Sequence, residues 1–269
     1  MKSSRSALFA VVLSGALAVT AACGDKKDDS AATPGAAAPA TSAAAPSPTA
    51  DAKAELTAAF KKLAAVSMTY TASTDTAGAG GTKITGAADP NAKATSATMV
   101  ITAAGQTINA QMLVVNTDMY LKMDLPLPGV DAKKWMYIDG SKTSLSKLGL
   151  GSPDDPANIK NFTDAVVTAE KTGATSFKGT FDATKRNIPA VGAQLIQSMG
   201  DAAKAIPFEA TVGADGYLTG LTVKMPAAGQ IPATTSTQTF SDFGKPVTIK
   251  KPAAGETQPA PAALLAQFA

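Results

Sequence analysis

The chain has 269 residues, with 24 lysines and arginines against 21 aspartates and glutamates, no histidine and a single cysteine. This inventory excludes histidine-based acid–base catalysis, Ser-His-Asp triads, zinc sites built from histidine and cysteine, and disulfides within the chain. The formal net charge is only +3, so there is no basic excess to drive binding to nucleic acid.

The first 22 residues have the composition of an export signal. Lys2 and Arg5 form a charged start, and the apolar run over 7–19 is too short to remain as a transmembrane helix. Removing Lys2 and Arg5 leaves 22 basic against 21 acidic residues, a net charge of +1. Residues 1–22 are therefore predicted to be a removable signal peptide.

The cleavage region ends in Ala21-Ala22-Cys23 and resembles a bacterial lipobox. In that motif the cysteine thiol receives a diacylglyceryl group and becomes the new N-terminus. We expect Cys23 to be lipidated and to hold the protein at the extracytoplasmic face of the cell membrane. The alternative is an ordinary secretory signal that leaves a free thiol behind.

A tether is predicted to follow the lipidated cysteine over residues 23–50. Residues 30–50 contain only Ala, Pro, Ser, Thr and Gly, a composition that has nothing to bury and stays disordered. Residues 24–50 would span about 29 Å as a flexible coil and about 84 Å when fully extended. The folded part is expected to stand off from the membrane.

The first half of the folded part reads as a helix followed by a meander of strands. Asp51 is a plausible N-cap for a helix over 52–65, whose apolar residues recur at helical spacing. From Val66 onward the apolar period is two, which indicates strands joined by tight turns. The expected strands cover 68–73, 83–87, 97–102, 108–114, 119–123 and 134–139.

The second half mixes helices and strands. A helix is expected to start at Asp155-Pro156, with a buried stripe of Ile159, Phe162 and Val166, and a second helix is expected over 188–199. Strands are predicted around 177–181 and over 208–212, 217–225 and 236–243, with a last short piece at 247–250.

Together these elements predict one α+β domain over 51–252. Its single large antiparallel sheet would curl into a half-barrel around two or three helices. Residues 253–269 are expected to form a flexible tail, although Leu264, Leu265 and Phe268 are apolar enough to dock.

The element order and the lipobox, together with Asn158–Phe162, Gly179–Phe181, Ile188–Met199 and Phe240–Pro252, resemble the actinobacterial LppX/LprG lipoproteins. The resemblance implies a LolA/LolB-like half-barrel with an apolar cavity between sheet and helices. It further implies a protein that binds acylated lipids and carries them across the envelope, with a membrane transporter as a candidate partner. It implies no catalytic residues and no cofactor.

Strand alternation places eight apolar residues on one sheet face, where they either fill a core or line a cavity for acyl chains. Four of the eight are methionines, which suit adaptable binding surfaces. The candidates for the cavity are Met99, Ile101, Ile108, Met112, Val114, Met119, Leu121 and Met123, together with Phe177 and Phe181.

Two groups are candidates for the cavity mouth. Leu125, Leu127 and Val130 lie in a proline-interrupted loop that would be a lid, a membrane-touching tip or merely a variable surface loop. Trp135 and Tyr137 are amphipathic aromatics that fit either a cavity mouth or the core.

The sequence thus predicts a membrane-anchored, non-catalytic lipoprotein. It would bind acylated lipids or glycolipids and carry or present them in the cell envelope. The alternative is an envelope interaction or sensor lipoprotein with a filled core and no ligand. The spacing of the carboxylates predicts neither a metal site nor a glycosidase pair.

Overall fold

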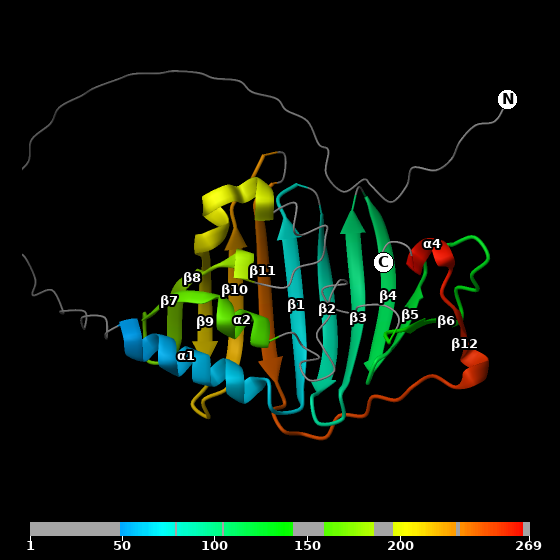
Figure 1. Cartoon of the computed structure of the whole chain (residues 1–269), viewed down its shortest axis with the longest axis horizontal. Coiled ribbons are helices and arrows are strands. Elements are labelled where there is room, and N and C mark those ends of the chain that lie inside the picture. Colours follow the sequence, from blue (N-terminus) through cyan, green and yellow to red (C-terminus); the bar gives the residue numbers. More distant parts are fainter. Residues whose placement is uncertain are drawn as a thin grey trace, which may run out of the picture.

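The computed structural model describes residues 49–78, 80–103, 105–141, 159–185, 196–229 and 232–265. One sheet of 12 strands dominates these residues, with the order β12-β6-β5-β4-β3-β2-β1-β11-β10-β9-β8-β7 (Figure 1). Neighbouring strands are antiparallel except β12 and β6, which are parallel. The expected α+β architecture with one large, mostly antiparallel sheet is confirmed.

Two consecutive meanders build the sheet. The first comprises β1 (Met68–Thr76), β2 (Gly80–Asp89), β3 (Ala94–Ala103), β4 (Gln106–Val115), β5 (Asp118–Met123) and β6 (Trp135–Asp139). The second comprises β7 (Val166–Lys171), β8 (Ser176–Phe181), β9 (Ile206–Val212), β10 (Leu218–Met225) and β11 (Thr234–Ser241). Antiparallel pairing of β1 with β11, from Thr69 opposite Ser241 to Thr76 opposite Thr234, joins the two meanders.

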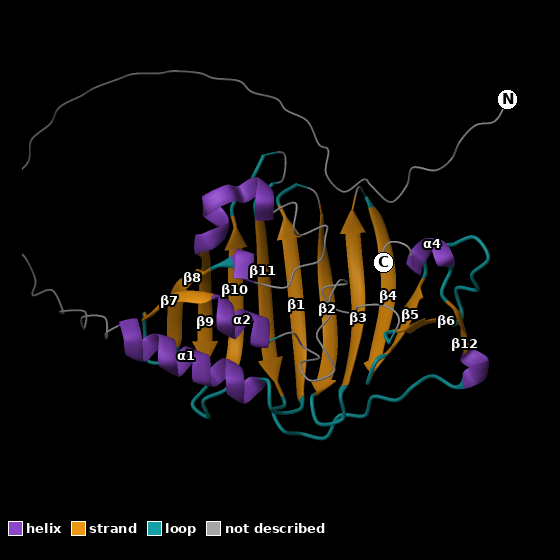
Figure 2. Ribbon diagram, in the orientation of Figure 1, coloured by secondary structure: helices purple, strands orange, loops and turns teal. Residues whose placement is uncertain are grey.

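Helices α1 and α2 lie over the second meander (Figure 2). Helix α1 (Thr49–Leu63) buries Leu56, Phe60 and Leu63, and α2 (Lys160–Ala165) stacks Phe162 on Phe60 with ring centroids 6.2 Å apart. The short helices η2 (Ala183–Lys185) and η3 (Gly200–Ala205) lie against each other at the same part of the sheet. None of the helices in the described part of the chain is long and apolar enough to cross a membrane.

Two separate apolar clusters lie on the sheet. The helix-covered cluster gathers buried residues of α1 and β7–β11, among them Phe60, Phe177, Phe181 and Phe208. The methionine-rich cluster lies over β3–β6. Its buried members are Ala97, Met112, Val114, Met119, Leu121, Met136, Ile138, Ala260 and Leu264, and Ile84, Met99, Met123, Leu127, Val130 and Leu265 pack against it partly buried.

The structure differs from expectation around α2. This helix ends at Ala165, and Val166, which we expected on its buried stripe, adopts an extended conformation and begins β7, a strand we did not predict. The sequence Val166-Val167-Thr168 explains the switch, because β-branched residues favour strands over helices.

The C-terminal segment also differs from the loose tail that we expected over 253–269. After residues 245–253, which have no regular structure, come η4 (Ala254–Glu256), β12 (Thr257–Pro259) and α4 (Ala262–Leu265). The expected strand piece at 247–250 is therefore absent. The expected signal peptide, most of the expected tether and positions 188–195 of the expected helix over 188–199 lie outside the described residues, whereas 196–199 are helical.

Candidate functional site

Strand register places the eight candidate residues of the first meander on one face of the sheet. Met112 lies opposite Leu121, Ile101 lies opposite Ile108, and the other four follow the same alternation. Through β2, β1 and β11 the same face continues to Phe240, which belongs to the helix-covered cluster. This inner face therefore carries both apolar clusters, and the prediction that the eight share one face is confirmed.

Burial along this face changes from one end of the strands to the other. Met112, Val114, Met119 and Leu121 are buried, with exposed fractions between 3% and 8%. In contrast Met99, Ile101, Ile108 and Met123, which lie toward the turn between β3 and β4, are only half-buried. The apolar face is therefore closed at one end and partly open at the other.

Two buried residues of β6 complete the methionine-rich cluster, and sequence reasoning did not select them. Met136 lies opposite Leu121 and Ile138 lies opposite Met119, and both are 1% exposed. Alternation within β6 offered a signal, since these residues interleave with Trp135 and Tyr137. Both faces of β6 are apolar, however, so alternation alone does not show which one points inward. That depends on the strand with which β6 pairs, which the sequence does not reveal.

Trp135 and Tyr137, the aromatic candidates for the cavity mouth, accordingly lie on the outer face, opposite to the methionine-rich cluster. The Tyr137 ring lies 5.5 Å from that of Tyr120, and its hydroxyl donates a hydrogen bond of 3.0 Å to Asp118 Oδ1. This hydrogen bond, with burial, raises the pKa of Tyr137 to about 12. Trp135 lies beneath Lys122, whose Nζ is 5.9 Å from the ring centroid.

Phe177 and Phe181 lie on the inner face but far from the methionines. Both are at most 2% exposed and belong to the helix-covered cluster. The ring of Phe181 meets that of Phe162 edge-on at 6.0 Å. These two residues fill a core beneath α1 and α2, and they do not lie beside the eight residues of the first meander.

The loop after β5 lies beside the half-open end of the inner face. Leu127 and Val130 pack against the methionine-rich cluster, whereas Leu125 is half-buried outside it. Asp124 fixes the start of this loop by accepting hydrogen bonds from the side chain and backbone of Asn109 at 2.6 and 2.8 Å. These two hydrogen bonds lower the pKa of Asp124. The loop is thus an ordered border of the apolar face.

The C-terminal segment covers another part of the methionine-rich cluster. Strand β12 pairs in parallel with β6, and Ala260 and Leu264 become buried on the cluster. Gln258 reinforces this attachment, because its amide donates to the Asp131 carbonyl at 2.8 Å and accepts from the Asp131 amide at 3.1 Å. The cluster is therefore assembled from two parts of the chain that are distant in sequence, the first meander with its loop and the C-terminal segment.

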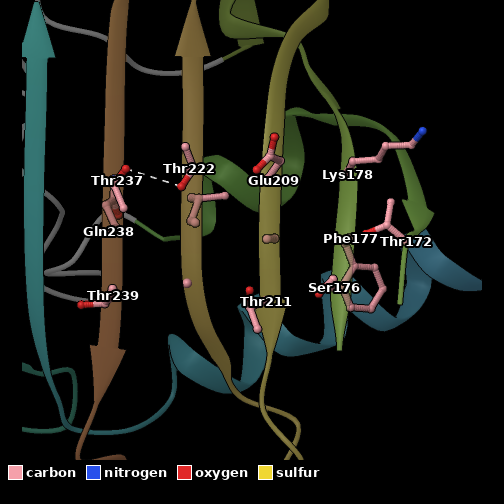
Figure 3. A pocket seen from close by; sticks show the side chains of 13 residues that line it. Thr172, Ser176, Phe177, Lys178, Glu209, Thr211, Thr222, Thr237, Gln238 and Thr239 are labelled. Atoms are coloured by element: carbon pink, nitrogen blue, oxygen red, sulfur yellow. Dashed lines mark hydrogen bonds between the residues drawn. The ribbon is translucent and has the colours of Figure 1, made fainter. Parts of the chain in front are cut away.

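Depressions also occur on the outer face, and they have a different character. One of about 490 Å³ lies over β8–β11, where polar residues such as Glu209, Thr211 and Thr222 line it together with Phe177, Ala210 and Leu221 (Figure 3). Its two charged residues are paired with neighbours, Glu209 with Lys224 at 2.6 Å and Lys178 with Glu170 at 3.3 Å, and Thr222 reaches Thr237 at 3.5 Å. A smaller one of about 190 Å³ lies beside Trp135. Neither resembles an acyl-chain site, which needs an apolar lining.

Metal and covalent sites have no support in the described residues. These residues contain no group of three or more histidine, cysteine, aspartate or glutamate side chains that could hold a metal ion. Cys23, the expected lipidation site, lies outside the described part of the chain.

Comparison with known proteins identifies no family. No protein-family model matches the chain, and no curated protein matches its sequence. In structure it is similar to a LolA superfamily protein from Nitrosomonas europaea, with a TM-score of 0.25 and 10% sequence identity over 81% of this chain and 98% of that one. A likeness at this level shows nothing about the function of this chain.

Proposed function

We propose that the protein binds the acyl chains of a lipid or glycolipid on the methionine-rich part of its inner face. The observation that carries this proposal is the half-open end of that face. There Met99, Ile101, Ile108 and Met123 are all apolar and only half-buried, whereas most of the helix-covered cluster on the same side of the sheet is buried. An apolar surface that folding leaves partly uncovered gains free energy when a guest covers it.

The methionines suit such a guest. Met99, Met112, Met119, Met123 and Met136 all lie on this face. Unbranched, polarisable side chains adapt their shape to a flexible hydrocarbon chain better than β-branched ones do. Each buried CH₂ group contributes about 0.8 kcal/mol, so about 20 methylenes offset an association cost of up to roughly 15 kcal/mol. Two ordinary acyl chains supply that number.

In the cell, the lipidated Cys23 would hold the domain at the extracytoplasmic face of the membrane, on a tether long enough for it to move. The domain would then carry or present its lipid within the envelope and exchange it with a membrane transporter or another acceptor. No chemical reaction is assigned to it. The intact mass of the denatured protein tests the anchor, since acylation of Cys23 adds the mass of a diacylglyceryl group.

The second candidate is an envelope interaction module with a filled core. It is favoured by the coverage that Leu127, Val130 and Leu264 already give to the methionine-rich cluster. The two functions differ in what happens when the half-open end is blocked. A carrier loses its ligand, whereas a filled module is unaffected.

The variant Ile108→Trp makes this test, because Ile108 is half-buried at the open end of the inner face. We expect the full chain to bind a diacylglycerol with one fluorescently labelled acyl chain, and the variant to bind it about tenfold more weakly. Thr107→Trp is the matched control, because Thr107 is the residue next to Ile108 and its side chain is exposed on the outer face. Melting curves establish that both variants fold. If Ile108→Trp does not fold, Met99→Trp takes its place in the test.

Equal binding by wild type, Ile108→Trp and Met99→Trp would place the ligand elsewhere. Absence of binding by the wild-type protein would favour the filled module.

A further inference from the structure

A band of uncharged polar side chains crosses the inner face between the two apolar clusters. Thr74 of β1 lies opposite Thr82 of β2 on one side and Ser236 of β11 on the other. Gln238, two residues further along β11, lies opposite Ala72 and Leu221. All four polar side chains are half-buried. We call Thr74, Thr82, Ser236 and Gln238 the polar band.

The four side chains of the polar band have no hydrogen-bond partner among the described residues. Other hydroxyls of the same two strands do pair: Thr71 and Thr239 lie 2.6 Å apart and Thr69 and Ser241 lie 2.9 Å apart on the outer face, and Thr76 and Thr234 lie 3.5 Å apart at the end of the inner face. Half-buried polar groups that find no partner in the protein favour a ligand or water that supplies one. The polar band is thus the part of the inner face that can recognise the polar end of a lipid.

The sheet positions around the polar band carry no charge. The inner-facing positions of β1–β6 and β9–β11 contain no aspartate, glutamate, lysine or arginine. Apolar neighbours flank it, with Ile101 opposite Thr82 and Val223 opposite Ser236. A phosphate placed here would lose hydration, and these sheet positions offer no cation to offset that costly loss. Neutral hydroxyl and ester groups would instead find matching donors and acceptors.

We infer that the polar band binds the neutral, hydroxyl-bearing head of a diacylated lipid and discriminates against anionic phospholipids. This inference rests on the proposed function, since it assigns the head of the lipid whose chains lie on the methionines. The amide of Gln238 both donates and accepts hydrogen bonds, as do the three hydroxyls, so the polar band can satisfy a polyol or a glycerol ester. Specificity would then come from the polar band and affinity from the apolar face.

The test compares two labelled probes that differ by one phosphate, a diacylglycerol and a phosphatidic acid with identical acyl chains. The full-length protein in detergent is expected to bind the diacylglycerol about tenfold more tightly at neutral pH. Gln238→Lys places a cation in the polar band and is expected to abolish or reverse this preference. Thr237→Lys, the adjacent exposed residue on the outer face, is the matched control and should keep it.

The outcomes separate the two proposals. If the wild-type protein binds both probes equally or prefers phosphatidic acid, the assignment of the head fails and the carrier stands. The assignment also fails if Gln238→Lys and the second variant, Thr82→Lys, both fold and keep the wild-type preference. If neither probe binds, the carrier itself fails, and the polar band loses its ligand with it.

Discussion

At the scale of single residues, a buried serine closes the seam between the two meanders. Ser67 precedes β1, and its hydroxyl donates a hydrogen bond of 2.7 Å to the Lys245 carbonyl. Its own carbonyl accepts from the Gly244 amide at 2.8 Å. Gly244, with φ of 70°, and Asp242, with φ of 56°, both adopt the left-handed conformation that brings the chain back to Ser67. The end of β11 is thereby fixed to the start of β1.

Replacing Ser67 by alanine should therefore weaken the seam. The variant leaves the carbonyl of Lys245 without its donor, and we expect a loss of about 1 kcal/mol in the free energy of unfolding. Urea denaturation measures it. Ser73→Ala is the control, because Ser73 is exposed on the outer face and its loss should change stability by less than about 0.5 kcal/mol. Equal stability of both variants would show that the seam does not depend on this hydrogen bond.

Tyr137 makes the fold sensitive to alkaline pH. Its pKa is raised from 10.0 to about 12 by the hydrogen bond to Asp118 and by burial, so the neutral phenol stabilises the folded state. This contribution is complete below pH 10 and is lost as pH rises toward about 12, because the unfolded chain ionises first. The pKa of Lys251, raised by its hydrogen bond to the same carboxylate, acts in the same direction.

We therefore expect the melting temperature to fall between pH 10 and about 12, and to fall less steeply in Tyr137→Phe. Some slope remains in the variant, because burial also raises the pKa values of Tyr70 and Tyr120. Identical slopes in wild type and variant would refute the role of Tyr137.

Residue-level prediction from the sequence succeeded where one face of a strand is polar. In β3 and β4, Thr98, Asn109 and Gln111 mark the outer face, so alternation assigned Met99, Ile108 and Met112 correctly to the inner one. Alternation could not show which face of β6 points inward, because Trp135 and Tyr137 on one face are as apolar as Met136 and Ile138 on the other. Only pairing with β5 settles which pair faces inward.

At the scale of elements, the C-terminal segment is part of the domain. Figure 1 shows it running from the end of β11 along the lower edge of the sheet to β12, beside β6. Its attachment uses backbone pairing, the two hydrogen bonds of Gln258 and the ion pair of Lys251 with Asp118. The sequence could not predict this attachment, because a three-residue strand and a four-residue helix are too short to show a recognisable apolar periodicity.

Leu264 tests how much this segment contributes. It is 8% exposed on the methionine-rich cluster, and Leu264→Ala should lower the free energy of unfolding by about 2 kcal/mol, at the low end for a buried leucine because a terminal helix can readjust. The control is Val167→Ala, whose side chain is 42% exposed on β7 and should matter little. If thermal unfolding gave equal stabilities for the two variants, α4 would rest on the sheet without stabilising it.

Helix and strand boundaries were predictable wherever periodicity was long. Strands β3, β4 and β10 and helix α1 match their expected positions within a few residues. The boundary between α2 and β7 was not predictable, because a single run of β-branched residues changes the chain from helix to strand with no loop between them. Local pattern gives no warning of such a junction.

At the scale of the whole molecule, the sheet has one inner face and two unequal covers. Helices α1 and α2 seal the second meander, and its aromatic rings pack beneath them. The first meander is covered by the short α4 and a loop, and its methionines remain half-buried at one end. The polar band lies between the two. This asymmetry is what the proposed lipid would complete, with its chains on the methionines and its head on the polar band.

Native mass spectrometry of the full-length protein, purified gently from the membranes of its own host, tests this account most directly. The account predicts a non-covalently bound diacylated lipid with an uncharged head, released on unfolding and depleted in Ile108→Trp. A wild-type protein that carries no lipid, and whose melting temperature is unchanged by added diacylglycerol, would contradict it.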